Sequence, residues 1–292
     1  MSKIVFTRSG IIPVYKESGP TSTDIIRNLK KKYSFKKIGH LGTLDPMAEG
    51  VLPIMINQAT KLAPLLEDEV KKYKTVVKFG IKTDTDDITG NVIHFAEAFN
   101  LNKNDLREVL TGFLGEQEQI PPLYSAKKIN GKRAYKLARE GKEFEIKPQK
   151  IEIYEIELKR FALPYAEIEI KCSKGTYIRS VVRDLGDKLG IPSTMSKLIR
   201  LSSSGFDFKN SVKLREISEN IGDYIIPLEN IFNFPKVHIN KFEQKLIQNG
   251  QIPKMIKISS DGYTQLFFKN KLSAILYMDK NEVGIFRVFK QD

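Results

Sequence analysis

The sequence predicts an α+β protein with one large domain followed by a smaller, mostly β domain. Three observations favour this class. The chain has 292 residues, a length that favours one large domain plus a smaller one. Amphipathic helical segments alternate with strand-like segments through most of it, and short strands predominate after the pattern breaks near IFNFPKV, residues 231–237. We therefore expect a first domain over residues 1–232 and a second over residues 233–292.

The segment TSTDIIRNLKKKY, residues 21–33, predicts the first helix. Thr21 or Ser22 can cap its start, and its apolar residues fall on one face. These apolar residues are Ile25, Ile26, Leu29 and Tyr33.

A constrained loop, GHLGTLDPMAEG at residues 39–50, then precedes the buried-looking strand VLPIMI. Its glycines permit positive φ or the close approach of another backbone, and Pro46 biases Asp45 towards an extended backbone. An ordinary turn uses the same residue types. The loop is therefore either a plain turn or a rigid support that fixes the Asp45 carboxylate for chemistry.

Alternating and amphipathic segments continue through the middle of the chain. KKYKTVVKFG, residues 71–80, predicts a strand with Tyr73, Thr75, Val77 and Phe79 on one side and mostly lysines on the other. NKNDLREVLTGFLG, residues 102–115, predicts a capped helix that ends near Gly115.

Residues 120–146 form a long basic connection with an Asn130-Gly131 turn and one short helix. Connections of this length are usually functional or mobile. Two alternating strands follow at 150–161 and 165–172. The last helix of the first domain, residues 176–190, turns Ile178, Val181, Val182, Leu185 and Leu189 inward and is stopped by its final glycine.

The charge favours a nucleic-acid partner. Forty-eight Lys plus Arg against 35 Asp plus Glu give a net charge of +13. Such a surplus attracts polyanions, although a lysine-rich surface that contacts only solvent would give the same count. The single cysteine, Cys172, excludes an internal disulfide, and we find neither a membrane-spanning run nor a signal peptide. We therefore expect a cytoplasmic protein.

Several kinds of active site have no support in the sequence. The three histidines are scattered and form no Cys/His cluster that could bind zinc. We find no P-loop, no dinucleotide fingerprint and no nucleophile elbow. An enzyme with this sequence would work with carboxylate, phenol and guanidinium groups, and we expect neither a cofactor nor a metal.

The loop around Asp45, GHLGTLDPMAEGVLPI, resembles the catalytic motif of TruB, the bacterial family of tRNA pseudouridine synthases that modify uridine 55 in the T loop. Further matches follow in the same order and at compatible spacing through residues 10–232. They are KESGPTS (16–22), QATKL (58–62), KKYKTVVKFG (71–80), TDTDDITG (83–90), IPPLYSAKKINGKRAYKLAREG (120–141) and CSKGTYIRSVVRDLGDKLG (172–190).

This resemblance implies the pseudouridine synthase fold, a mixed and largely antiparallel sheet flanked by helices, with a small PUA-like RNA-binding domain at the C-terminus. It implies a substrate, the T stem-loop of tRNA, and a reaction that needs no cofactor and no protein partner. We expect a monomer, because no exposed heptad or long apolar surface pattern is visible.

By resemblance, Asp45 is the catalytic carboxylate of a reaction that breaks the N1–C1′ bond and rejoins the uracil through C5. The carboxylate could attack C1′ or remove the 2′ proton, and the sequence leaves both routes open. Arg179 matches the arginine that pairs with it, and Tyr73 matches the tyrosine that stacks on the target base. Without the resemblance, Arg179 would be interpreted as a solvated helix residue and Tyr73 as a core aromatic.

Other matches concern substrate binding. His40 matches a histidine that holds the T loop with its base flipped out, Lys16 one that supports the active-site loop, and Tyr177 and Leu198 residues that line the base pocket. Residues 123–142 match a mobile thumb that closes on RNA. The thumb cations expected to face phosphates are Lys127, Lys128, Lys132 and Arg133.

The chain departs from the family pattern at a few positions. It has Tyr15-Lys16-Glu17 where members commonly have Asp-Lys-Pro, Leu41 where a Thr or small residue is usual, and Glu49 where a small or neutral residue is usual. Glu49 adds negative charge near a surface expected to face RNA. None of these departures removes a residue expected to do chemistry.

Two alternative functions remain open: a guide-RNA-dependent pseudouridine synthase subunit, and a non-catalytic RNA-binding or tRNA-folding protein. The insertion at residues 123–142 favours the stand-alone enzyme over the first. The joint presence of Asp45, Tyr73 and Arg179 favours catalysis over the second.

Overall fold

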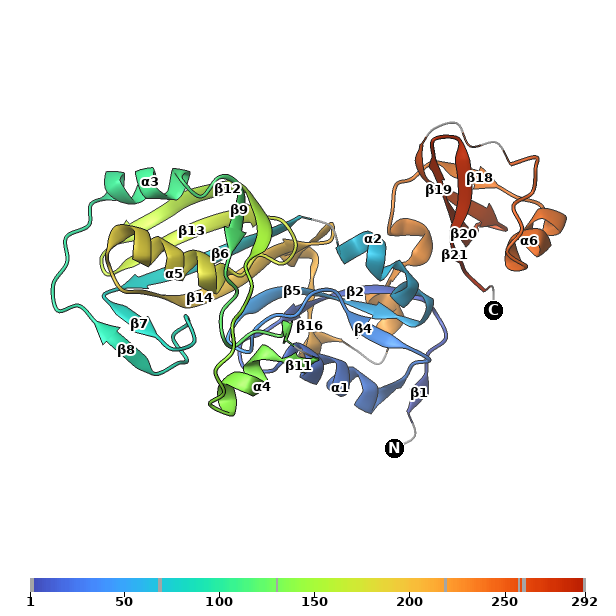
Figure 1. Ribbon diagram of the computed structural model, residues 1–292. Helices are drawn as coiled ribbons and strands as arrows, with labels where there is room; N and C mark the ends of the chain where they lie inside the picture. The colour runs from blue at the N-terminus through green and yellow to red at the C-terminus, as the bar shows by residue number, and fades with distance from the viewer. Residues whose placement is uncertain are drawn as a thin grey trace.

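The computed structural model describes residues 3–67, 70–129, 131–217, 220–256, 258 and 261–290. Figure 1 shows a large body built on a long sheet and a smaller C-terminal module beyond α2 (Ala63–Glu67). The α+β class predicted from the sequence is confirmed. No helix in the described part of the chain is long and apolar enough to cross a bilayer.

The central sheet runs in the order β16-β2-β5-β14-β6-β13-β12-β9, with β4, β15 and β17 paired at its side. Most neighbours are antiparallel, but β14 and β5 meet in a short parallel seam, at Ile199 with Glu49 and Arg200 with Gly50. The strands are β2 (Gly10–Lys16), β4 (Ile38–His40), β5 (Glu49–Ile56), β6 (Lys71–Phe79), β9 (Gly115–Gln119), β12 (Gln149–Ala162), β13 (Tyr165–Cys172), β14 (Ser193–Ser203), β15 (Phe206–Asp207), β16 (Val212–Lys213) and β17 (Ile226–Pro227). The seam joins two halves of the sheet.

Local signals determine most element boundaries. α1 (Ser22–Lys32) starts with a capping box between Thr21 and Asp24, and α5 (Ile178–Leu189) ends at Gly190, whose φ is 66°. α3 (Lys103–Thr111) ends earlier than the expected stop near Gly115, because Gly112 caps it and Gly115 instead begins β9 with φ of 89°.

β6 shows the expected alternation: Tyr73, Thr75, Val77 and Phe79 are buried. On its other side Lys72 and Lys74 pair with Glu169 and Glu167 of β13, each at 2.9 Å. The body's main hydrophobic cluster lies between this sheet and the helices α1, α3 and α5.

The predicted thumb, residues 123–142, contains a short antiparallel pair, β10 (Lys128–Ile129) with β11 (Lys132–Arg133), and the helix α4 (Ala134–Arg139). Asn130 of the predicted turn lies outside the described residues. In Figure 1, α4 and β11 lie below the central sheet, on the opposite side of the body from α3.

The C-terminal module is a sheet in the order β18-β19-β20-β21, accompanied by α6 (Lys241–Gln248). One face of this sheet packs on the body through Phe267, Ile275 and Phe289, which share a cluster with Ala59 and Leu62. Its strands are β18 (Lys236–His238), β19 (Gly262–Phe268), β20 (Lys271–Asp279) and β21 (Glu282–Val288).

The remaining elements are short. The strands are β1 (Ile4–Val5), β3 (Tyr33–Ser34), β7 (Ile81–Thr83) and β8 (Val92–Phe95), and the 3₁₀ helices are η1 (Asn57–Leu62), η2 (Phe208–Asn210), η3 (Leu214–Glu216), η4 (Ile221–Tyr224) and η5 (Leu228–Asn230). β7 and β8 form a separate hairpin.

Candidate active site

A cavity of about 590 Å³ lies beside the seam between β5 and β14. Its wall is built by the loop 41–45, the start of β6, the turn before α5, the first turn of α5 and the middle of β14. Five predicted site residues line it together. They are Asp45, Tyr73, Tyr177, Arg179 and Leu198.

The side chain of Lys16 holds the loop that carries Asp45. Lys16 is completely buried, and its Nζ donates to the carbonyl oxygens of Ala48 at 2.6 Å, Pro46 at 2.9 Å and Glu17 at 3.2 Å. Pro46 follows Asp45 directly, and Ala48 lies three residues after Asp45. These hydrogen bonds hold the backbone from which the Asp45 carboxylate projects.

Two glycines of the loop are required by geometry. Gly42 and Gly50 have φ of 69° and 110°. A Cβ on Gly50 would lie 2.2 Å from the carbonyl oxygen of Arg200, so the loop could not approach β14 with any larger residue there. Glycine at position 50 therefore lets the loop lie against β14, and this contact together with the Lys16 hydrogen bonds holds the loop in place.

Arg179 binds the Asp45 carboxylate with two nitrogens: Nε lies 2.9 Å from Oδ2 and Nη2 lies 3.1 Å from Oδ1. Its side chain is 6% exposed, whereas that of Asp45 is 33% exposed and can meet a ligand in the cavity. The two-pronged geometry orients the carboxylate and balances its charge.

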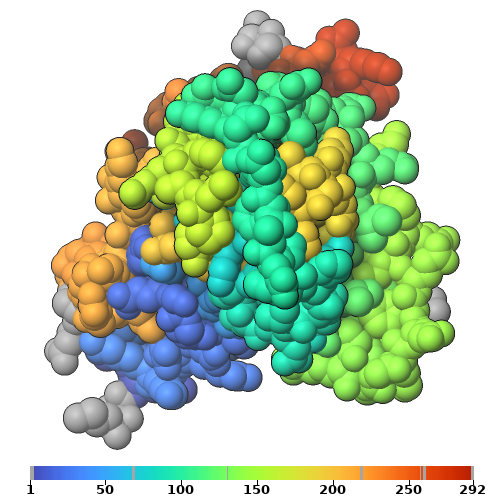
Figure 2. Space-filling view, turned by 90° about the vertical axis from the view of Figure 1, so that its left-hand side faces the viewer, coloured from blue at the N-terminus to red at the C-terminus, as the bar shows by residue number. Residues whose placement is uncertain are grey.

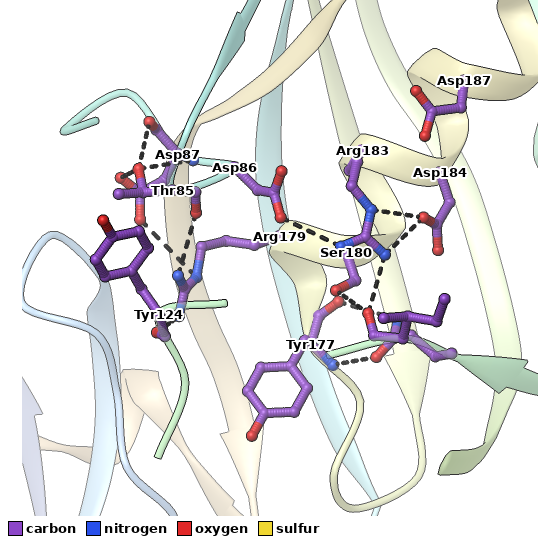
Figure 3. A network of polar contacts seen from close by, with 12 residues as sticks. Thr85, Asp86, Asp87, Tyr124, Tyr177, Arg179, Ser180, Arg183, Asp184 and Asp187 are labelled. Carbon is purple, nitrogen blue, oxygen red and sulfur yellow. Dashed lines mark hydrogen bonds and ion pairs between the residues drawn. The ribbon is translucent and has the colours of Figure 1, made fainter. Parts of the chain in front are cut away.

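A polar network fixes Arg179 in turn (Figure 3). Its guanidinium donates to the carbonyl oxygens of Thr85 and Tyr124, each at 3.2 Å, and lies 3.8 Å from Asp87 Oδ2. Asp87 also accepts from the backbone N–H of Thr89, so it is both a turn aspartate and a neighbour of the guanidinium.

One turn further along α5, Arg183 binds the turn that contains Asp86 and the segment that contains Ile120 to the same helix (Figure 3). It contacts Asp86 at 3.3 Å and Asp184 at 2.8 Å, and it donates to the carbonyl oxygen of Ile120. Burial raises the pKa of Asp86, and Arg183 opposes this shift. The turn at residues 85–87 and the segment that leads into the thumb are thus anchored to the helix that carries Arg179.

Arg200 is a residue of the cavity wall that the sequence did not single out. It is 1% exposed, and it donates to the carbonyl oxygens of Val51 at 2.8 Å and Gly42 at 3.2 Å and hydrogen bonds with the Tyr73 side chain. Burial raises the pKa of Tyr73, whereas Arg200 acts to lower it. The sequence does contain a signal for Arg200. Side chains two positions apart on a strand point to the same face, so Arg200 shares the buried face of Leu198.

The other predicted binding residues lie outside the cavity wall. His40, at the end of β4, is half-buried, and its buried Nδ1 has no hydrogen-bond partner among the described residues. Burial, and then Arg200, lowers the pKa of His40. The predicted thumb cations Lys128, Lys132 and Arg133 are exposed, and Lys127 donates to the Lys147 carbonyl.

The cations that do line the cavity are Lys71, Lys150, Lys174, Arg179 and Arg200. Figure 2 shows the thumb, in green, and the β7–β8 hairpin, in teal, as neighbouring lower parts of one face of the molecule. In the described residues no group of three or more His, Cys, Asp or Glu side chains could hold a metal ion.

Comparison with known proteins identifies similar sequences. Residues 30–178 match the model of the TruB family pseudouridylate synthase N-terminal domain. The chain is 43% identical to tRNA pseudouridine synthase B of Clostridium tetani, over 83% of this chain and 84% of the relative. It is 37% identical to that of Alkaliphilus oremlandii, over 97% of this chain and 94% of the relative.

Solved structures share the fold. A Cbf5-Nop10-Gar1 complex contains a chain that superposes with a TM-score of 0.69 at 23% identity, covering 96% of this chain and 84% of the other. An H/ACA RNP bound to a substrate RNA containing 2′-deoxyuridine gives the same TM-score at 20% identity, over 97% of this chain and 85% of the other. The expected pseudouridine synthase fold is thereby confirmed.

Proposed function

Because the chain belongs to the TruB family of pseudouridylate synthases, we propose that it isomerises uridine 55 in the T loop of tRNA to pseudouridine. The observation that carries this proposal is the Asp45 carboxylate, held by two nitrogens of Arg179 and facing a cavity that Tyr73 also lines. The enzyme works alone, as a cytoplasmic monomer, without a guide RNA and without a cofactor.

Asp45 begins the reaction at the ribose. Its carboxylate either attacks C1′ or removes the 2′ proton, and in both routes the N1–C1′ bond breaks with its electron pair on the uracil. Arg179 keeps the carboxylate aimed at the sugar, which is an orienting contribution to the rate. The uracil then turns in the cavity, and C5 bonds to C1′.

Tyr73 receives the flipped base. Eversion of the nucleotide costs a few kcal/mol, and stacking on an aromatic ring recovers about 1–3 kcal/mol. The Tyr73 phenol gives its proton to the uracil anion that cleavage leaves, and the resulting phenolate accepts the proton of C5 once C5 is bonded to C1′. Arg200, which hydrogen bonds with the Tyr73 side chain, stabilises this phenolate.

Phosphate contacts supply the remaining affinity for tRNA, and the net charge of +13 favours such contacts. Lys150 and Lys174 at the cavity hold phosphates next to the target nucleotide. The thumb cations Lys128, Lys132 and Arg133 hold the stem-loop from outside, and the module of residues 233–292, which we propose as a separate PUA-like domain, binds a more distant part of the tRNA.

The decisive experiment uses unmodified tRNA labelled with tritium at uridine C5. We expect tritium release from one T-loop uridine without added cofactor, and a loss of about 10²- to 10⁴-fold in Asp45→Asn with RNA binding retained. Release only after addition of a guide RNA would establish the ribonucleoprotein alternative. Tight tRNA binding without release would establish the non-catalytic one.

A further inference from the structure

Helix α5 begins at a residue that is poorly suited to cap a helix. Its N-cap is Tyr177, which makes no side-chain capping hydrogen bond, and the first turn contains no acidic residue. Helix starts are normally fixed by Ser, Thr, Asp or Asn at this position. Tyr177 nevertheless lines the cavity, and Arg179, two residues later, binds the Asp45 carboxylate. A helix start of this importance calls for support from another part of the chain.

Gln119, the last residue of β9, gives this support. It is 2% exposed, and its amide pairs with the backbone of Tyr177. Oε1 accepts a hydrogen bond from the Tyr177 N–H at 2.8 Å, and Nε2 donates to the Tyr177 carbonyl oxygen at 3.1 Å. Two residues of an antiparallel ladder exchange hydrogen bonds in the same way. Because the Tyr177 carbonyl also accepts from the N–H of Val181, the first hydrogen bond of the helix, Gln119 fixes the point at which α5 starts.

A second glutamine holds the turn that leads to Tyr177. Gln149 of β12 is the register partner of Gln119, so the two side chains lie on one face of the sheet. Its Nε2 donates to the carbonyl oxygen of Gly175, which has φ of 81°, at 2.7 Å. The two strands therefore present a pair of amides to residues 175–177. Gln149 is half-buried, whereas Gln119 is buried and has both ends of its amide paired.

Ile120, the next residue of the chain, binds α5 on the other side of Arg179. Its carbonyl oxygen accepts a hydrogen bond from Ser180 Oγ at 2.8 Å. Arg179 therefore lies between two anchors from one segment, at Tyr177 before it and at Ser180 after it (Figure 3). Loss of the first anchor would leave the helix bound to this segment from Ser180 onwards and would release the residue on which its first hydrogen bond depends.

We propose that Gln119 is a positioning residue of the active site: it acts as an external cap that sets where α5 begins, and it thereby places Tyr177 and Arg179 in the cavity. Gln119 is not among the described residues that line the cavity, so it acts through the backbone of Tyr177. A misplacement of about 1 Å around a reacting centre can lower a rate about 10²-fold. The inference rests on the proposed function for this effect on the rate.

Gln119→Glu tests the reciprocal pairing through its response to pH. A protonated carboxyl both donates and accepts, so it can replace the amide at Tyr177, whereas the ionised carboxylate can only accept and repels the Tyr177 carbonyl oxygen. Burial keeps a glutamic acid neutral well above its ordinary pKa. In single-turnover tritium release, we expect Gln119→Glu to be about 10²-fold slower than the wild type near pH 8.5. Relative to the wild type, it should recover at least about tenfold near pH 6. Gln119→Met, which can form neither hydrogen bond, should be slow at every pH.

Gln117→Glu and Gln117→Met are the matched controls. Gln117 lies two residues earlier on the same face of β9, and its Nε2 donates to the carbonyl oxygen of Phe113, which is not among the described residues of the cavity wall. Both should follow the wild type at every pH. The charged residues that adjoin Gln119 on neighbouring elements, Arg183 on α5 and Lys150 on β12, are the same in every variant. A Gln119→Glu loss of equal size at every pH, or a wild-type rate in Gln119→Met, would overturn the proposal.

A measurement without substrate separates this inference from the proposed function. In protein labelled with 3-fluorotyrosine, the ¹⁹F resonance of Tyr177, assigned with Tyr177→Phe, reports the surroundings of its ring. We expect this resonance to shift in Gln119→Met, and to shift in Gln119→Glu near pH 8.5 but return towards its wild-type position near pH 6. It should stay in place in both Gln117 variants. If the wild type releases no tritium, the proposed function fails while this resonance still decides whether Gln119 places Tyr177. An unmoved resonance in Gln119→Met would refute the inference.

Discussion

The support of Asp45 and the thumb are two regions of the molecule with opposite physical character. Beneath Asp45, Lys16 and Arg200 are buried, and their hydrogen bonds to backbone carbonyls are short and specific. In the thumb, Lys128, Lys132 and Arg133 are exposed side chains on two short strands. The difference teaches that the groups assigned to bond-breaking are preorganised, whereas those assigned to RNA capture can adapt. Substitutions in the first region should therefore change the rate of chemistry, and those in the second should change affinity.

Among the residues around Asp45, the largest effect is expected for Arg179→Met, which removes both contacts to the Asp45 carboxylate. We expect single-turnover tritium release to fall about 10²- to 10³-fold, because a preorganised charge partner is lost. Arg183→Met is the matched control, since Arg183 lies one turn along the same helix and pairs with Asp86 and Asp184 outside the cavity. An equal loss in both variants would mean that Arg179 serves only to hold α5.

Tyr73→Phe tests the phenol separately from the ring. The ring still stacks, so tRNA affinity measured by filter binding should stay near that of the wild type. Turnover should fall about 10²-fold, because the group that accepts the C5 proton is missing. Wild-type turnover in this variant would assign Tyr73 to stacking alone.

The buried lysine should make stability and activity respond to pH in opposite directions. The pKa of Lys16 is about 8 in the folded protein and 10.5 ordinarily, so between these values the unfolded chain binds more protons and folding stability rises with pH. We expect urea unfolding to show a gain of about 1 kcal/mol from pH 7 to pH 9. Over the same range the turnover rate should fall.

Lys16→Met is the control. Its stability should not rise in this way between pH 7 and pH 9, even if it differs from that of the wild type at every pH. The window ends at pH 9 because burial raises the pKa of the Cys172 thiol from 9.0 to about 11, which lowers stability as pH rises further. A rise of equal size in Lys16→Met would assign the pH dependence to other groups.

The smallest effect per residue is expected in the thumb. The double variant Lys132→Gln and Arg133→Gln should weaken tRNA binding and lower the slope of log affinity against log salt by about one for each lost phosphate contact. Turnover at saturating tRNA should not change. The same charge change at Lys103 and Arg107 of α3, on the opposite side of the body in Figure 1, should leave affinity unaltered. A change in saturated turnover would contradict the assignment of the thumb to capture.

The sequence by itself determined the local structure and the inventory of reactive groups. The Thr21 cap, the alternation of β6 and the glycine stop of α5 depend on spacing within a few residues, and the structure confirms them. The resemblance to the family motif indicated Asp45, Tyr73 and Arg179 as the residues of the proposed reaction. The end of α3 was misplaced, because Gly112 and Gly115 offer two competing stops and only the pairing of β9 selects between them.

Only the tertiary structure decided which groups meet. Asp45 and Arg179 are 134 positions apart, and Arg200 reaches Val51 across 149. Their contacts depend on strand order and on the parallel seam between β5 and β14, which hydrophobic periodicity does not encode. The same packing gives the buried Lys16 ammonium its acceptors Pro46 and Ala48, about thirty positions along the chain. Spacing along the chain fixes which side of an element a residue occupies, but charge compensation in a buried site depends on distances that exist only once the sheet has assembled.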